Sequence, residues 1–436
     1  MSVKPLIPGD VVPDRREKFR EFMRRFNPAA PAHLAIEQGL IVEEKTRSLY
    51  KRIATRSDLE PGSQQILIGG IGSGKTTELL LAARWLGKQG KSLPLFIDVS
   101  QQTDLSKLNS GALLAGLGLA ISGHLKPLVA NLERPAEVRA DVTAAREKIK
   151  EFAYGTTYQQ WIPGPDPDYY PDDYQDYPPD PEYYEREREH YESGYYRTVR
   201  TPPRLHPPFP FPPLDRDMQA ALEPLRLLVD AIRDLNADPI AIFDGLDRLM
   251  DAQRFAVVAI QDLRAIRSLS ISVVASAPLS LLYGEGRQIA DLFDKIHYLP
   301  AALADPERDP FVMQVIERRA GGELLGPKEI HELCRGSGGV LRDLIALARN
   351  AAEEAYIDDS ESIGLEHVRR AVLQLGQSYF LGLGRTQIQA LLKLSNEGSF
   401  SPADASHLDL LLSRRVLERP PDQYEVHPAL APLLAE

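Results

Sequence analysis

The sequence is poor in three features that each mark a class of protein. It holds one cysteine, Cys334, in 436 residues, so it can form no intramolecular disulfide and no cysteine cluster for zinc; we expect a buried thiol. Its net charge of −11 disfavours a mainly electrostatic hold on DNA or RNA, although a local basic patch stays open. It has no apolar run of the roughly 20 residues that cross a bilayer and no signal-peptide pattern at its start. These absences predict a cytoplasmic protein.

The remaining composition is that of a globular protein, with 43% hydrophobic and 26% charged residues. The length predicts two or three domains. Between residues 61 and 303, short apolar segments alternate with helical patterns, which is typical of a parallel sheet covered by helices. We therefore predict an α/β fold with a three-layer core. The predicted strands are Ile66–Ile68, Ser92–Ser100, Pro239–Asp247, Ser270–Pro278 and Lys295–Leu303, and the predicted helices are Lys75–Gln89, Leu105–Gly123 and Phe255–Leu269.

Residues 1–60 are predicted to form an N-terminal helical segment that precedes this core. Arg15–Phe26 is basic and amphipathic, with phenylalanines at helical spacing, and Leu40–Arg56 predicts a second helix. A basic amphipathic helix can contact membranes or nucleic acid, but we favour packing of Arg15–Phe26 on its own domain.

Residues 154–214 interrupt the α/β pattern. Most of the 17 tyrosines and many of the 35 prolines of the chain lie in this segment, which is also rich in aspartate. Because proline removes backbone donors and disfavours helix and sheet interiors, we predict a disordered or polyproline-type insertion. We favour a solvated loop for this segment. The alternatives are a docking surface for a partner protein and a target of tyrosine phosphorylation.

Two helical regions follow the predicted core. Residues 304–380 read as a helical lid, and residues 381–436 as two helices and a hairpin, an order that predicts a winged-helix domain. The lid helices are Pro310–Arg319, Pro327–Arg335, Val340–Tyr356 and Leu365–Leu375, and the winged-helix elements are Gln387–Leu394, Pro402–Arg415 and Val416–Val426.

The stretch GGIGSGKTTELL, Gly69–Leu80, fits the P-loop consensus G-x(4)-G-K-[ST] between a predicted strand and a predicted helix. Glycines let several backbone N–H groups curl round one anion, and the amino end of the helix adds a positive dipole. We expect Lys75 to reach the β- and γ-phosphates, the Thr76 hydroxyl to coordinate Mg²⁺, and Thr77 to lie near the α-phosphate. The predicted binding residues of the loop are Gly69, Gly72, Ser73, Gly74, Lys75, Thr76 and Thr77.

A P-loop predicts a second, acidic part of the site at the end of a buried strand. The segment IAIFDGLDRL places Asp244 directly after four apolar residues and Asp247 one turn further on. A carboxylate in that place is costly unless a charge meets it, so we predict that Asp244 holds magnesium together with Thr76. Asp247 is a candidate for orienting the attacking water, and capping of the next helix is its alternative role.

With these motifs, the sequence resembles the P-loop NTPases of the AAA+/STAND type over about residues 60–436, less the insertion. FDGLDRL is similar to the second acidic motif of NACHT-type STAND proteins and KAP-type ATPases, and GSGGVLRDLIALARNAAEEA, Gly336–Ala355, resembles the sensor-2 helix of origin-recognition-type AAA+ proteins. The resemblance implies that Arg342 is a sensor-2 arginine that reaches the γ-phosphate from the lid, and that Ser276 is the polar sensor-1 residue. The alternatives are a solvated arginine and a buried serine satisfied by backbone.

The sequence departs from the resemblance at two positions. Gly245 follows Asp244 where AAA+ enzymes usually carry glutamate, and Arg248 follows Asp247 where the common STAND form ends in Asp-Glu. We therefore expect slow or assembly-dependent hydrolysis. An arginine finger stays open among Arg264, Arg267 and Arg287.

The resemblance implies an ATPase that binds ATP and Mg²⁺ and forms ADP and phosphate. We expect a nucleotide-dependent switch that controls a partner protein, with a place in bacterial anti-phage defence and with homo-oligomerisation open. The alternative is an origin-recognition-like DNA-binding loader or regulator, and a third reading is a nucleotide-binding scaffold without turnover.

The charges of the predicted winged helix favour the switch that controls a partner protein over the DNA-binding loader or regulator. Its residues 401–419 mix both signs of charge, which is a poor footprint for DNA phosphates, so DNA is not the favoured partner. In STAND proteins the same domain is a packing module, and we expect His427 to be structural. The charged residues in question are Asp404, Asp409, Arg414, Arg415, Glu418 and Arg419.

Overall fold

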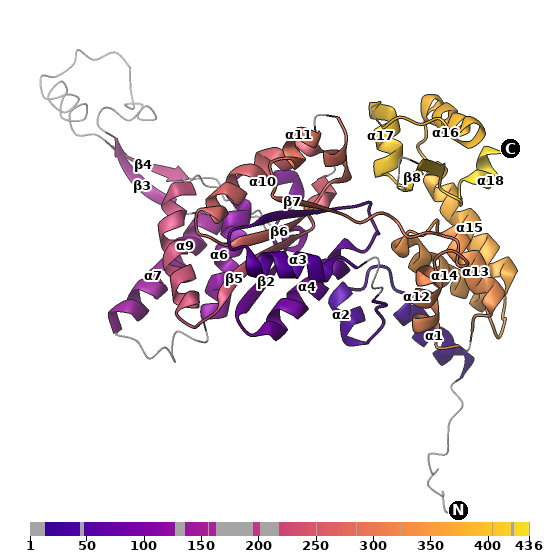
Figure 1. Ribbon diagram of the computed structural model, residues 1–436, viewed down its shortest axis with the longest axis horizontal. Coiled ribbons are helices and arrows are strands. Elements are labelled where there is room, and N and C mark those ends of the chain that lie inside the picture. Colours follow the sequence, from indigo (N-terminus) through magenta and orange to yellow (C-terminus); the bar gives the residue numbers. More distant parts are fainter. Residues whose placement is uncertain are drawn as a thin grey trace, which may run out of the picture. The chain divides into compact units, whose positions relative to one another are not determined.

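The computed structural model describes most of the chain, and its helices and strands are drawn in Figure 1. These elements divide into two compact units. The first unit holds residues up to Asp98, residues 237–260 and residues from Ile266 onward, and the second holds residues 99–236 and 261–265. No helix within the described ranges is long and apolar enough to span a membrane. The described residues are 14–43, 48–126, 136–155, 157–162, 195–200, 218–249, 251–284, 286–322, 324–402, 404–419 and 423–435.

The first unit is built on a five-stranded parallel sheet in the order β2-β5-β6-β1-β7. Every residue of β1 and β6 is buried, as expected for interior strands of a parallel sheet. The α/β class with a parallel sheet is therefore confirmed, and each predicted strand exists with shifted ends. The strands are β1 (Gln64–Ile68), β2 (Ser92–Asp98), β5 (Asp238–Asp244), β6 (Ser272–Ala277) and β7 (Lys295–Tyr298).

Two helices of the same unit, α3 (Tyr50–Leu59) and α4 (Lys75–Gln89), pack together and against this sheet. Their apolar residues share one core with the inner strands, including Ile53, Leu79 and Ile242, none of which is exposed to solvent. The helix predicted over Leu40–Arg56 is wrong in its bounds, because residues 40–43 form no helix and α3 begins only at Tyr50. The preceding helix, α2 (Ala32–Glu37), ends before Gly39, whose φ is +67°.

The start of α3 is set by a side chain that lies far away in the sequence. Glu78 of α4 accepts hydrogen bonds from the backbone N–H groups of Leu49 (2.6 Å) and Tyr50 (2.7 Å). Since the first N–H groups of a helix have no partner within it, this carboxylate fixes the helix to begin at Tyr50.

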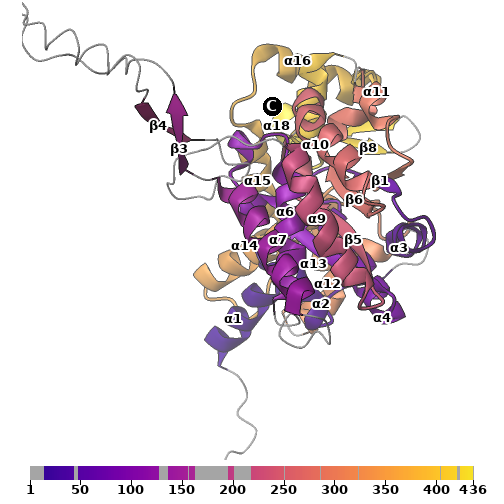
Figure 2. The same cartoon turned by 90° about the vertical axis from the view of Figure 1, so that its left-hand side faces the viewer.

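The second unit is mainly helical (Figure 1 and Figure 2). The helices α6 (Ala112–Leu125), α7 (Ala136–Tyr154) and α9 (Met218–Arg233) pack on one another, and the strand–helix alternation predicted neither α7 nor α9. Of the predicted insertion over 154–214, two parts form an antiparallel pair, β3 (Thr157–Ile162) and β4 (Tyr195–Arg200). The prediction of disorder for residues 163–194 and 201–214 falls outside the described residues.

The helix predicted over Leu105–Gly123 is interrupted, because the first residues form only the short 3-10 helix η1 (Leu105–Lys107). Helix α6 begins after Gly111, and Asp262 caps it from α10 (Ala252–Arg267). The Asp262 carboxylate accepts from the backbone N–H groups of Gly111 (2.5 Å), Leu113 (2.7 Å) and Leu114 (3.2 Å). Burial raises the pKa of Asp262 to about 6 against the opposing effect of these donors.

We expect Asp262→Ala to lower the free energy of unfolding by about 3 kcal/mol, because it leaves buried N–H donors without an acceptor. Asp251→Ala is the matched control, since Asp251 caps α10 through Gln253 and Arg254 at an exposed position, where a lost cap costs about 1 kcal/mol. Urea unfolding of both variants provides the measurement. Equal losses would show that the buried cap by Asp262 contributes no more to stability than an exposed one.

The helices after residue 304 form a second core of the first unit, which is shared with the N-terminal helix. Phe19, Phe22 and Phe26 are buried in this core, and Arg319 donates to the Arg25 carbonyl at 2.7 Å. The basic helix thus packs within the chain, as favoured, but on the helices after residue 304 rather than on the core that residues 1–60 were expected to precede. Cys334 is buried there too, and burial raises the pKa of its thiol to about 12. The helices are α1 (Arg15–Arg25), α12 (Phe311–Ala320), α13 (Pro327–Gly336), α14 (Leu341–Ile357) and α15 (Leu365–Phe380).

The C-terminal segment has the predicted order of two helices and a hairpin. His427 is fully buried and its Nδ1 accepts from the backbone N–H of Ala429 at 3.2 Å, so its structural role is supported. Assignment of this segment to the winged-helix family stays a prediction. The elements are α16 (Arg385–Glu397), α17 (Ala405–Leu412), β8 (Val416–Arg419), β9 (Gln423–Val426) and α18 (Ala431–Leu434).

Candidate functional site

The loop between β1 and α4 has the backbone that its glycines predict. Gly72 and Gly74 have φ angles of +81° and +105°, which residues other than glycine rarely adopt. A Cβ on Gly69 would lie 2.3 Å from the carbonyl oxygen of Leu299, so the loop passes too close to its neighbour for any larger residue. Helix α4 begins directly after the loop, at Lys75, and its amino end therefore faces the space that the loop encloses.

Lys75 is buried and all three of its ammonium protons have acceptors. Its Nζ donates to the carbonyl oxygens of Gly69 (2.8 Å) and Gly70 (2.9 Å) and forms an ion pair with Asp247 at 2.9 Å. A phosphate oxygen that binds this ammonium must replace one acceptor. Asp247 is the one that can leave by side-chain rotation, because the other two belong to the loop backbone.

The Thr76 hydroxyl donates to Oδ2 of Asp244 at 2.7 Å, which joins the start of α4 to the end of β5. Hydroxyl and carboxylate oxygens are hard ligands of the kind that Mg²⁺ prefers, with phosphate and water oxygens completing its octahedron. Within the described residues no group of three or more His, Cys, Asp or Glu could hold a metal alone. The pair fits a magnesium ion that arrives with a polyphosphate.

The charge around Asp244 also fits a cation. Burial raises the pKa of Asp244, the hydrogen bond from Thr76 opposes this, and the carboxylates of Asp247 and Asp98 raise it further. Asp98 ends β2 in direct register with Asp244 on β5. The sequence analysis placed Asp98 at a strand end without assigning it to the site, and the parallel register was the missing information.

Ser276 is fully buried on β6, and its Oγ accepts from the backbone N–H of Leu246 at 3.2 Å. Leu246 opens the 3-10 helix η3 (Leu246–Leu249), which carries Asp247. Ser276 thus helps to hold the turn that presents Asp247. This hydrogen bond fits the alternative prediction, a buried serine whose hydroxyl is satisfied by the backbone. The sensor-1 role of Ser276 stays a prediction.

The first turn of α14 lies directly on the P-loop. A Cβ on Gly72 would lie 2.8 Å from Cβ of Arg342 and 3.0 Å from Cγ1 of Val340, and one on Gly74 would lie 3.4 Å from Cδ1 of Leu341. Arg342 is exposed and makes no hydrogen bond or ion pair with any other residue in the described ranges. The structure therefore brings Arg342 to the loop with its guanidinium donors available.

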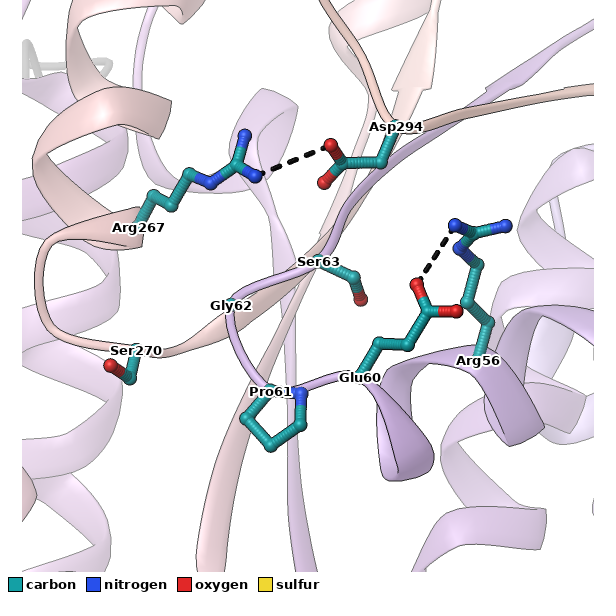
Figure 3. A pocket seen from close by; sticks show the side chains of 8 residues that line it. All are labelled: Arg56, Glu60, Pro61, Gly62, Ser63, Arg267, Ser270 and Asp294. Carbon is teal, nitrogen blue, oxygen red and sulfur yellow. Dashed lines mark hydrogen bonds and ion pairs between the residues drawn. The ribbon is translucent and has the colours of Figure 1, made fainter.

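A cavity of about 390 Å³ lies at the opposite edge of the sheet (Figure 3). Its residues precede strands, whereas the P-loop follows one: Ser63 precedes β1 and Asp294 precedes β7. Two ion pairs line it, Arg267–Asp294 at 3.3 Å and Arg56–Glu60 at 2.8 Å. Arg267, one candidate arginine finger, therefore lies away from the P-loop edge within this chain.

The other predicted residues are less informative. Arg287 forms an ion pair with Asp291 at 3.8 Å, and Arg264 forms no ion pair within the described ranges. Thr77 follows Thr76 in the first turn of α4 and is partly exposed, and Ser73 is buried in the loop. Which arginine would serve as a finger stays open, and contacts of Thr77 and Ser73 with phosphate stay predictions.

Comparison with known proteins gives distant likenesses. No family model and no curated protein matches the sequence. Among solved structures, Cdc6p from Pyrobaculum aerophilum is 12% identical, with 94% of this chain and 97% of that one covered and a TM-score of 0.38. The Aeropyrum pernix ORC1 protein in complex with DNA is 16% identical, with 90% and 93% covered and a TM-score of 0.40. Drosophila ORC bound to DNA is 12% identical, with 100% and 96% covered and a TM-score of 0.43. At this distance, we transfer no function from these proteins to this chain.

Proposed function

We propose that this chain binds ATP with Mg²⁺ in the P-loop and is an ATPase of the AAA+/STAND type. The observation that carries the proposal is the 2.7 Å contact between Thr76 and Asp244, which unites two motifs 168 residues apart beside the buried ammonium of Lys75. When bound, Mg²⁺ would supply positive charge to the phosphates, held by Thr76 and Asp244. Lys75 and the loop N–H groups would orient the phosphate chain.

Hydrolysis to ADP and phosphate needs a group that orients water. Asp247 lies 2.9 Å from the Lys75 ammonium, which supports a place near the terminal phosphate. Its departure from Lys75 on phosphate binding would release its carboxylate for a water molecule. The residues that follow the two acids, Gly245 and Arg248, are the reason to propose slow turnover that depends on assembly.

We further propose that bound triphosphate acts as a switch. Arg342 belongs to α14, whose first turn rests on Gly72, so a γ-phosphate that attracts the guanidinium would hold this turn in place. Because we recognise no effector domain in the chain, a partner protein would carry the output. The role in anti-phage defence that the resemblance suggests stays a prediction.

DNA binding by a loader or regulator is the second candidate. The observation in its favour is that α16 keeps two exposed cations, Arg385 and Lys393. Against it, the arginines of the following segment are engaged within the chain: Arg414 with Asp343, Arg415 with the Tyr379 carbonyl, and Arg419 with the Ala302 carbonyl. Few cations therefore remain there for DNA phosphates.

The test compares nucleotide and DNA binding by the purified full chain. We expect calorimetry to show ATP binding that strengthens with Mg²⁺, and we expect slow release of phosphate. A non-hydrolysable ATP analogue should increase the mass of the particle in solution if the chain assembles into a homo-oligomer. ATP binding without any phosphate release would favour the scaffold reading. Strong binding of duplex DNA that falls steeply between 50 and 200 mM salt, as expected for about six or more phosphate contacts, would favour the loader. The absence of ATP binding would contradict the proposal itself.

A further inference from the structure

Asp343 is a buried carboxylate on the first turn of α14, next to Arg342. Three groups from outside α14 surround it. Tyr379 donates its hydroxyl to Oδ2 at 2.6 Å, Arg414 donates Nη1 to Oδ1 at 2.6 Å, and His427 places Nε2 at 3.5 Å from Oδ2. A charged group this deeply buried is stable only when it is paired and hydrogen-bonded.

The three groups belong to different parts of the chain, and only one of them is a permanent cation. Tyr379 lies on α15, His427 follows β9, and Arg414 lies between α17 and β8. The Arg414 side chain is 20% exposed. The charge of Asp343 is therefore balanced mainly by one arginine of the C-terminal segment, 71 residues away.

The backbone of Arg414 is held in an unfavourable conformation. Its φ is +67°, a left-handed value that residues other than glycine, asparagine and aspartate rarely adopt. Such strain persists only where surrounding contacts impose it. Within the described residues, the side chain of the neighbour Arg415 donates to the backbone carbonyls of Tyr379 (2.7 Å) and Leu381 (3.0 Å) and pairs with no carboxylate, so it offers a comparison to Arg414.

We propose that Arg414 is a positioning residue of the nucleotide site: by pairing with Asp343, it fixes the first turn of α14 and leaves the guanidinium of Arg342 available to the triphosphate. This inference rests on the proposed function. Without Arg414, the Asp343 carboxylate would lack its cation and would compete with the γ-phosphate for Arg342. The C-terminal segment and the P-loop would thereby be coupled through one helical turn, since the same turn contacts Gly72.

The experiment measures Kd for Mg-ATP and Mg-ADP with wild type, Arg414→Ala and Arg415→Ala. For Arg414→Ala we expect the preference for ATP over ADP to fall about tenfold, the size of one charge-assisted contact, with ADP binding changed less than about twofold. Arg414→Lys should restore part of the preference. Arg415→Ala should keep it. A merely structural role would weaken both nucleotides together and leave their ratio unchanged.

Replacement of Asp343 tests the same Arg414–Asp343 ion pair through its carboxylate. If Arg414 acts by neutralising Asp343, then Arg414→Ala should change the ATP:ADP ratio much less in an Asp343→Asn background, giving a clear coupling energy. An unchanged ratio in Arg414→Ala, or equal losses for Arg414→Ala and Arg415→Ala, would overturn the inference. If thermal melting shows that Arg414→Ala does not fold, Arg414→Gln replaces it under the same criteria, and Arg414→Lys remains the partial rescue. Failure of the proposed function would look different, because wild type would then bind neither nucleotide.

Discussion

Replacement of Lys75 by alanine is expected to weaken binding of Mg-ATP by at least about 100-fold, since a charge-assisted hydrogen bond to phosphate and the buried positive charge are both lost. The ammonium is buried, with the residue 5% exposed, so no other cation replaces it easily. Fluorescence titration with a labelled nucleotide, together with phosphate release, provides the measurement. A variant that binds Mg-ATP with the affinity of wild type would exclude the P-loop as the binding site.

The matched control for this variant is Asp247→Asn. It removes the ion-pair partner of Lys75 but leaves the ammonium in place. Since no carboxylate then competes with phosphate for the ammonium, we expect Asp247→Asn to bind Mg-ATP at least as tightly as wild type. If both variants lost binding equally, the loss would reflect damage to the loop rather than absence of a cation.

The second large effect is expected for Asp244→Asn, which keeps an oxygen for the Thr76 hydroxyl and removes the negative charge. We expect phosphate release to fall roughly 100-fold, because the metal no longer has its one carboxylate ligand. We also expect Mg²⁺ to strengthen ATP binding far less than in wild type. Calorimetry in magnesium and in chelator measures this dependence.

Asp98→Asn is the comparison for this second prediction. Asp98 and Asp244 end neighbouring strands in register, so both changes remove one charge at the same edge of the sheet. Asp244 accepts the hydrogen bond from the Thr76 hydroxyl, and we expect the Asp98 change to alter the magnesium dependence by no more than about fivefold. Equal effects of the two changes would mean that the edge attracts magnesium by its total charge and holds it at no particular carboxylate.

The centre of the site was predictable because its signals are local. The run from Gln64 to Gln89 combines a short apolar strand, glycines and an amphipathic helix, and the structure has these elements in that order. The four apolar residues before Asp244 marked a buried strand end. Since carboxyl ends of parallel strands meet at one edge of a sheet, the approach of Asp244 to Thr76 followed from the predicted fold class.

What the sequence did not reveal depends on contacts between distant residues. The start of α3 is set by Glu78, the start of α6 by Asp262, and the surroundings of Asp343 by Arg414. Each of these side chains reaches a backbone or a partner that no local pattern indicates. Helices α7 and α9 did not follow from the strand–helix alternation, because the proline-rich residues between them interrupt that pattern, although both helices are amphipathic.

The contact of Gly72 and Gly74 with Val340, Leu341 and Arg342 has a kinetic consequence. Side chains this close to the loop restrict the route by which a nucleotide enters or leaves, so exchange should require the first turn of α14 to lift away. Dissociation would then be paced by that opening rather than by the strength of the phosphate contacts. A nucleotide captured in the cell should accordingly remain with the protein through purification and be recovered when the chain is denatured.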